Sequence, residues 1–119
     1  MKTYDKARLC LKIIKERKAL NPILFEVGEL ASITDYFLIA SGNSSRQVQA
    51  ITRHLIKQMR EAGFKPYGTE GEREGHWVLI DYGDIVIHVF YQPTREFYDL
   101  EGLWLEAPRI DLEKTGPSE

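Results

Sequence analysis

The chain has 119 residues, 43% of them hydrophobic, which is enough for the core of one domain and excludes a largely disordered protein. Its lone cysteine, Cys10, cannot form an intramolecular disulfide, and no apolar stretch approaches the length that crosses a bilayer. The N-terminus lacks the apolar segment of a signal peptide, so we expect a cytoplasmic protein that does not bind a membrane.

Charge is distributed unevenly along the chain. Residues 1–68 carry 12 Lys or Arg against 6 Asp or Glu, whereas residues 69–119 carry 4 against 12. An acidic second part disfavours nucleic acid as the main partner, and we expect no DNA binding. It favours a docking face for a basic protein.

The first 34 residues predict a helix, a strand and a connector. An amphipathic pattern covers residues 4–20 and stops at Asn21-Pro22, because proline disfavours helical geometry in the residue before it. Residues 23–27 have strand composition. In the connector over 28–34, we expect Leu30 and Ile33 to point inward.

The middle of the chain predicts a buried strand followed by a well-marked helix. The continuous apolar run over 36–40 is typical of a strand buried on both faces. Ser44 and Gln47 have the spacing of a capping box, and Gly63 stands where a left-handed residue ends a helix. The buried stripe of this helix is expected to be Val48, Ile51, Leu55 and Met59.

The remaining segments complete an α/β fold with a mixed sheet of about five strands flanked by helices. A short strand is expected within 64–69, a hairpin over 76–90 and a short helix after Pro93. Phe97, Leu100 and Trp104 are spaced to fold back on the sheet. We expect a single domain over 1–105 and a polar, disordered tail over 106–119.

The hairpin has two different faces. With its turn at Tyr82-Gly83, Asp81 pairs with Asp84, and Trp77 with His88. Because side chains alternate between faces, one face is aliphatic and consists of Val78, Ile80, Ile85, Ile87 and Val89. The other carries Trp77, Leu79, Asp81, Asp84, Val86, His88 and Phe90. Such a mixture is typical of a protein–protein hot spot; the alternative is that a helix covers this face and His88 is a core residue.

Catalysis finds little support in the residues. There is no HExxH or paired CxxC spacing, and His76 falls on the opposite face from His88, so we expect no metal and no other cofactor. Nucleotidyl transfer would use Ser41-Gly42 to hold phosphates, and Asp81 with Asp84 to hold Mg²⁺. These carboxylates flank a turn three residues apart, and no GxxxxGK[ST] loop exists. We therefore predict no catalytic residues.

Three ordered segments resemble the Iojap-like family of ribosomal silencing factors, RsfS. They are TDYFLIASGNSSRQV at 34–48, GEREGHWVLIDYGDIVIHVF at 71–90 and REFYDLEGLW at 95–104. The resemblance covers residues 3–105. It implies a nucleotidyltransferase-like α/β fold without transferase activity. It also implies a factor that binds the large ribosomal subunit through its ribosomal protein fourteen, sterically blocks joining of the small subunit and so represses translation.

Carried onto this sequence, the resemblance implies a docking surface centred on Trp77. Its other members would be Leu79, Asp81, Asp84, Val86 and His88, with edge contacts or supports from Arg95, Tyr98 and Trp104. The alternative functions are a nucleotidyltransferase-fold enzyme acting on a nucleotide or RNA, and nucleic-acid binding through the basic first helix. A homodimer also stays open, since self-association can protect an exposed aromatic patch.

Overall fold

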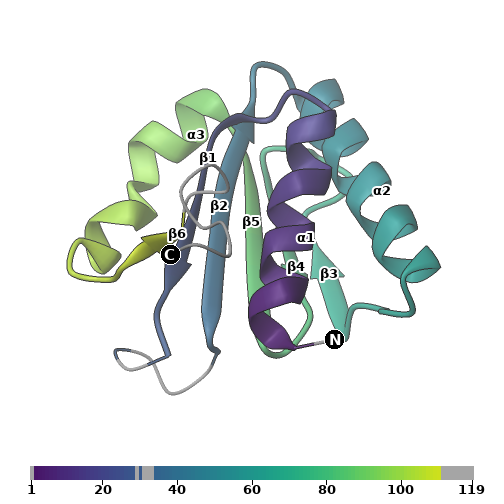
Figure 1. Ribbon diagram of the computed structural model, residues 1–119. Helices are drawn as coiled ribbons and strands as arrows, with labels where there is room; N and C mark the ends of the chain where they lie inside the picture. The colour runs from purple at the N-terminus through teal and green to yellow at the C-terminus, as the bar shows by residue number, and fades with distance from the viewer. Residues whose placement is uncertain (1, 29, 31–33, 111–119) are drawn as a thin grey trace.

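The computed structural model describes residues 2–28, 30 and 34–110, which form one mixed sheet with helices on both faces (Figure 1). Within these residues, none of the helices combines the length and the apolar character needed to cross a membrane. The elements in chain order are α1 (Thr3–Glu16), β1 (Leu20–Glu26), β2 (Tyr36–Gly42), α2 (Ser45–Glu61), β3 (Gly68–Glu70), β4 (Trp77–Asp81), β5 (Ile85–Tyr91), α3 (Gln92–Tyr98), the 3₁₀ helix η1 (Leu100–Trp104) and β6 (Arg109–Ile110).

The expected α/β class with a mixed sheet is confirmed, with six strands where about five were predicted. The strand order is β3-β4-β5-β2-β1-β6. Only β2 and β5 pair in parallel, and the other neighbours are antiparallel. Every residue of β2 is buried, as the continuous apolar run predicted for a central strand covered on both sides.

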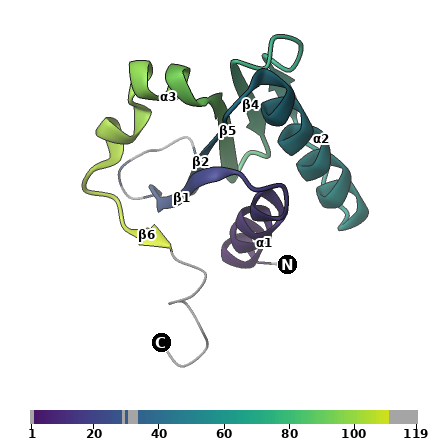
Figure 2. The same ribbon diagram turned by 90° about the horizontal axis from the view of Figure 1, so that it is seen from above.

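The helices divide between the two faces of the sheet (Figure 2). α1 and α2 cover one face and bury a large aliphatic core against it. α3 and η1 lie on the other face, over a smaller cluster rich in aromatic residues. Figure 2 shows α1 and α2 together on one side of the strands and α3 on the opposite side. The chain therefore presents two unlike layers around one sheet.

The end of α1 differs from the prediction. The helix stops at Glu16, because Lys18 adopts a left-handed φ of 60°. The Lys18 N–H donates to the Lys15 carbonyl and the Ala19 N–H donates to the Ile14 carbonyl, which is the hydrogen-bond pattern of a Schellman motif. The expected stop at Asn21-Pro22 was wrong, since both residues belong to β1 at a register irregularity between Leu20 and Ile23. Because residue 18 is a lysine and not a glycine, the sequence carried no signal for this helix end.

The limits of α2 are those that the sequence predicted. Ser44 is the N-cap, and its hydroxyl accepts from the Gln47 N–H at 3.1 Å. The Gln47 side chain accepts in return from the N–H of Asn43, one residue before the N-cap. Gly63 has a φ of 97° and closes the C-terminal end. The expected stripe is completely buried, at Val48, Ile51, Leu55 and Met59.

The hairpin forms, but its turn is one residue later than predicted. Tyr82 donates to the Ile85 carbonyl at 2.9 Å, which leaves Gly83-Asp84 as the two central residues. Gly83 has a φ of 84°, and glycine at the first central position is what a type II′ turn requires. The cross-strand pairs therefore shift by two, and Trp77 lies opposite Phe90 instead of His88. An even shift leaves the alternation between faces unchanged.

Three further expectations at the edges of the core were wrong. Leu30 is 53% exposed and does not point inward; Ile33 lies outside the described residues. Phe97 is 80% exposed, although Leu100 and Trp104 do pack on the sheet. The predicted disordered tail begins too early, since Ala107 is buried and Arg109–Ile110 pairs with β1. Residues 111–119 lie outside the described residues.

A candidate docking surface

Alternate residues of the hairpin face the two layers, and only one layer is closed. The aliphatic row predicted from the sequence is fully buried beneath α1 and α2: Val78, Ile80, Ile85, Ile87 and Val89. In the opposite row, Trp77, Leu79, Asp81 and Val86 are only partly buried. The structure therefore brings the predicted hairpin residues to a half-open face beside α3.

Trp77 is held in place by a buried histidine. Its indole Nε1 donates to Nδ1 of His88 at 2.8 Å, and its ring lies 5.0 Å from that of Phe90. His88 itself is 5% exposed, with its ring 4.6 Å from that of Phe37. Burial lowers the pKa of His88 to about 4, so that near neutral pH the ring is uncharged and Nδ1 accepts the indole proton. The structure therefore shows His88 as a core residue with a hydrogen-bond partner, which is the alternative that the sequence left open.

Helix α3 extends the surface with two exposed aromatic side chains. The Tyr98 ring lies 4.8 Å from the Trp77 ring, and the Phe97 ring is perpendicular to that of Tyr98. Tyr98 is 52% exposed. A hollow of about 410 Å³ lies between the start of β4 and α3, lined by His76, Trp77, Pro93, Thr94, Phe97 and Tyr98. We call Trp77, Leu79, Asp81, Val86, Phe97 and Tyr98 the Trp77 surface.

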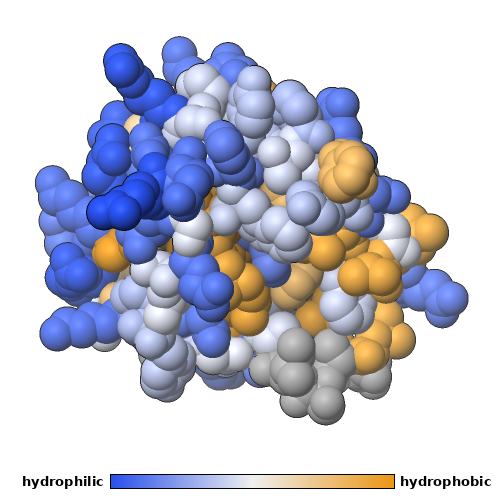
Figure 3. All heavy atoms as spheres, turned by 180° about the vertical axis from the view of Figure 1, so that it is seen from behind, coloured by the Kyte–Doolittle hydropathy of each residue, from blue (hydrophilic) through white to orange (hydrophobic). Residues whose placement is uncertain are grey.

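Exposed apolar residues continue from α3 along η1. Leu103 and Leu105 are largely exposed, and with Leu30 they line a second hollow of about 350 Å³. Figure 3 shows the apolar atoms gathered on the side of the molecule that carries α3. Sequence reasoning missed Phe97, Leu103 and Leu105. Phe97 has the spacing of a buried residue and gave no signal, whereas Leu103 and Leu105 lie outside that spacing in an apolar segment.

Trp104 supports η1 from the side of the sheet. Its ring packs edge-on against Phe37 at 5.5 Å and belongs to the smaller cluster beneath η1. Its indole nitrogen is buried and has no acceptor among the described residues. Trp104 therefore fastens η1 to the sheet while the neighbouring leucines face outward.

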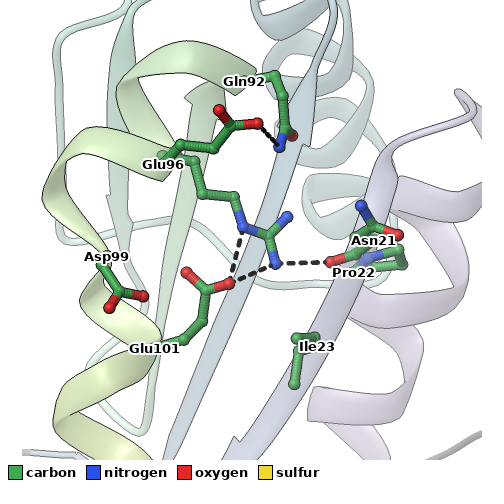
Figure 4. Close-up of a pocket in the computed structure, with 8 residues that line it drawn as sticks. Asn21, Pro22, Ile23, Gln92, Glu96, Asp99 and Glu101 are labelled. Carbon is green, nitrogen blue, oxygen red and sulfur yellow. Dashed lines mark hydrogen bonds and ion pairs between the residues drawn. The ribbon is translucent and has the colours of Figure 1, made fainter.

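Arg95 is also a support, at the pocket whose lining residues Asn21, Gln92 and Glu101 are labelled in Figure 4. The side chain is 4% exposed. Its guanidinium donates to the carboxylate of Glu101 at 3.0 Å, to the hydroxyl of Ser41 at 3.0 Å, and to the carbonyls of Leu20 and Asn21. These bonds join α3 and η1 to β1 and β2, at the side of a pocket of about 620 Å³. Arg95 thus fixes the segment that carries Phe97 and Tyr98.

The two hairpin carboxylates have separate tasks. Asp81 belongs to the half-open row, and its carboxylate accepts from the Gly83 N–H at 2.7 Å, which stabilises the turn. Asp84 does not lie on the Trp77 surface. Its carboxylate pairs with the ammonium of Lys6 at 2.9 Å and accepts from the hydroxyl of Thr3 on α1. The predicted position of Asp84 in the row of Trp77 was therefore wrong, because the turn directs its side chain toward the other layer.

The arrangement that nucleotidyl transfer would need is not assembled. β2 and β5 run in parallel, with Tyr36 beside Ile85 and Gly42 beside Tyr91. Ser41 therefore lies at one end of the strands and Asp84 at the other, roughly 20 Å apart for strands of this length. The Ser41 hydroxyl already bonds to Arg95, Gln92 and the Leu20 carbonyl. In the described part of the chain, no three His, Cys, Asp or Glu residues gather as a metal site would require.

Comparisons with known proteins give one consistent match. Residues 1–119 match the model of a family described as ribosomal silencing factor during starvation. A ribosomal silencing factor RsfS of Halalkalibacterium halodurans is 39% identical over 113 residues, which cover 95% of this chain and 97% of that protein. A Mus musculus protein named mitochondrial assembly of ribosomal large subunit protein 1 is 32% identical, and the match covers 81% of this chain but 43% of that protein. A crystal structure from Chromobacterium violaceum superposes with a TM-score of 0.85 at 34% identity, covering 87% of each chain.

Proposed function

The chain belongs to the RsfS family of ribosomal silencing factors, and from that membership we propose that it binds the large ribosomal subunit in the cytoplasm through its ribosomal protein fourteen. A protein bound there blocks the small subunit sterically and so represses translation. The silencing step needs no chemistry, and occupancy is set by the concentration of the factor and its affinity.

The observation that carries this proposal is the half-open Trp77 surface. Large aromatic residues clustered at a partly desolvated centre are the usual anchors of a protein interface. Here Trp77 is fixed by His88 from below and by Tyr98 from the side. A rigid anchor loses little conformational entropy on binding, so more of the contact energy appears as affinity. The hollow beside Trp77 and Phe97 can receive one side chain of the partner.

Charge around this surface fits a basic partner. Asp81 lies partly exposed at the end of β4 on this surface, whereas the exposed Glu96 and Asp99 line the separate pocket on the other side of α3. Exposed carboxylates at the rim of an interface speed association with a positively charged protein and orient it. We assign this role to Asp81 in place of Asp84, which pairs with Lys6.

An enzyme is the weaker candidate. Its serine and its carboxylates lie at opposite ends of the parallel strands, and Asp84 is paired with a lysine instead of a metal. A single substrate could not reach both groups. The relatives are named for silencing or assembling ribosomes, which agrees with a binding function.

Co-sedimentation with purified large subunits tests the proposal. Trp77→Ala and Tyr98→Ala are expected to weaken binding, the first by about thirtyfold or more, since loss of a central aromatic costs 2 kcal/mol or above. Tyr67→Ala is the matched control, because Tyr67 is an exposed tyrosine outside this surface. Isolated ribosomal protein fourteen is expected to rank the wild-type chain and the variants in the same order of affinity. Equal binding by all variants would contradict the proposed surface.

The blocking step has its own readout. Added to separated subunits, the wild-type chain is expected to lower the yield of joined ribosomes in proportion to its occupancy, whereas Trp77→Ala is expected to lower it far less. Self-association through the same exposed patch would compete with docking. Sedimentation at increasing protein concentration measures that competition directly.

A further inference from the structure

The solvent side of α2 carries a row of basic residues. Its members are Arg46, Arg53, Lys57 and Arg60, and all four are exposed. Their spacing of seven, four and three residues keeps them on one side of the helix, over roughly 21 Å. None of them forms an ion pair with a carboxylate that the structure describes. We call these four residues the α2 row.

Helix stability does not explain the α2 row. The first turn contains Arg46 and no acidic residue, although the positive end of the helix dipole favours a negative side chain there. Arg53 and Lys57 are four residues apart, where like charges repel. The opposite side of α2 already supplies its packing energy through a fully buried stripe. Arg60 lies in the last turn, where a basic residue complements the helix dipole. Arg46, Arg53 and Lys57 gain no such support, and their charges point to an anionic partner.

The α2 row begins beside the strand that carries Trp77. The Gln49 side chain in the second turn of α2 donates to the carbonyls of Glu72 and Arg73, in the loop that leads into β4. At Gly75 a Cβ would lie 2.8 Å from the Ser45 carbonyl, so the loop is pressed against the start of α2. α2 and α3 lie on opposite faces of the sheet (Figure 2), so this loop is where the start of the row comes near the strand that carries Trp77. A partner that extends around this loop can therefore contact both.

We propose that the α2 row binds the phosphate backbone of ribosomal RNA next to the protein on which the Trp77 surface docks. This inference rests on the proposed function and adds a second partner to it. Arg and Lys neutralise phosphates and release counterions, a term that is independent of base sequence. The chain as a whole carries a net charge of -2, so attraction to RNA comes from this local row and not from an overall positive charge.

A pair of charge-reversed variants tests the row. Arg53→Glu/Lys57→Glu removes two of its four charges, and Lys12→Glu/Lys15→Glu on α1 is the matched control, with the same change in net charge at exposed helix positions. Binding to large subunits is measured from about 50 to 200 mM salt. The α2 variant is expected to bind about tenfold more weakly at low salt and to lose about two units of the slope of log K against log salt, one for each lost phosphate contact. The α1 control is expected to stay close to wild type.

Two probes separate RNA from other anions. The wild-type chain is expected to bind a short RNA duplex at low salt and not to bind vesicles of anionic phospholipid. The α2 variant is expected to lose its binding to the duplex. Equal loss in both charge-reversed variants, loss in neither, or vesicle binding without duplex binding would overturn the inference.

Trp77→Ala, measured in parallel, separates this inference from the proposed function. If that variant loses the subunit while the α2 variant retains it, only the RNA contact fails. If the wild-type chain does not bind large subunits, the proposed function fails and the duplex result alone decides on the row.

Discussion

The two rows of side chains on the β4–β5 hairpin share a backbone but meet different layers. The row beneath α1 and α2 is aliphatic and has no solvent exposure, as at Ile80 and Ile87. The row beneath α3 and η1 has a buried floor of His88 and Phe90, but Trp77 and Leu79 remain partly open. The long helices close their face, whereas the seven residues of α3 and the short η1 do not.

This difference assigns stability to one layer and recognition to the other. Aliphatic side chains without exposure give their full transfer free energy to folding. Aromatic side chains that are only half covered release the rest of their transfer free energy when a partner covers them. A single strand can therefore serve both purposes because its side chains alternate.

Truncation of neighbouring residues on opposite faces of β4 compares the packing of the two layers directly. Ile80→Ala is expected to lower the free energy of unfolding by about 2 to 5 kcal/mol, since it opens a cavity in a closed core. Leu79→Ala, one residue earlier, is expected to cost below about 1.5 kcal/mol, because its side chain is partly exposed. Urea unfolding measures both. Equal losses would show that the two faces are packed alike.

The histidine under Trp77 should make the stability depend on pH. Burial lowers the pKa of His88 from 6.5 to about 4, so between these values the unfolded chain binds a proton that the folded chain does not. The free energy of unfolding is therefore highest above pH 6.5 and falls as the pH drops, by about 2 kcal/mol at pH 5. His88→Gln keeps an acceptor for the indole and should remove this part of the dependence, whereas His76→Gln should retain it. A pH profile of unfolding that is identical for His88→Gln and wild type would contradict the buried neutral imidazole.

The turn between the strands offers a smaller test of which layer Asp84 serves. Asp84→Asn leaves the Lys6 ammonium, which is largely buried, without its carboxylate. We expect a loss of about 1 to 2 kcal/mol in unfolding free energy, because Asp84 is itself partly exposed and the pair is screened. Large-subunit binding is expected to be unchanged. A loss of binding without a loss of stability would return Asp84 to the docking surface.

The smallest change in stability is expected at the most exposed part of the surface. Phe97→Ser should alter the free energy of unfolding by no more than about 0.5 kcal/mol, since the side chain is largely in solvent. The same variant should weaken subunit binding several-fold, because Phe97 lines the hollow that receives a side chain of the partner. Unchanged binding would remove Phe97 from the Trp77 surface.

Local patterns predicted the elements well, and turn chemistry decided where they failed. The capping box at Ser44 and the glycine at 63 set both ends of α2 because each has a direct backbone partner. Lys18 takes positive φ, which no residue pattern indicates, whereas Asn21 belongs to a residue type that enters the left-handed region more readily. The hairpin register moved by two because Gly83 fits the first central position of the turn better than Tyr82; Tyr82 is buried instead.

The candidate site was predicted in part for a similar reason. Alternation alone placed Trp77 and Leu79 on the right face, and the family motifs supplied Tyr98. The tertiary roles of Arg95 and Asp84 could not be read from spacing, because their partners lie 75 and 78 residues away in sequence. Whether a short helix covers or extends a sheet face is likewise a matter of packing between distant segments.

Hydroxyl-radical footprinting of the chain, free and bound to large subunits, shows which face of the molecule docks. The half-open layer is predicted to become protected on binding, at Trp77, Phe97 and Tyr98, while the exposed Tyr67 keeps its reactivity. Unchanged reactivity at Trp77 and Tyr98 in a complex that does form would contradict the account, because the chain would then be docked through another face.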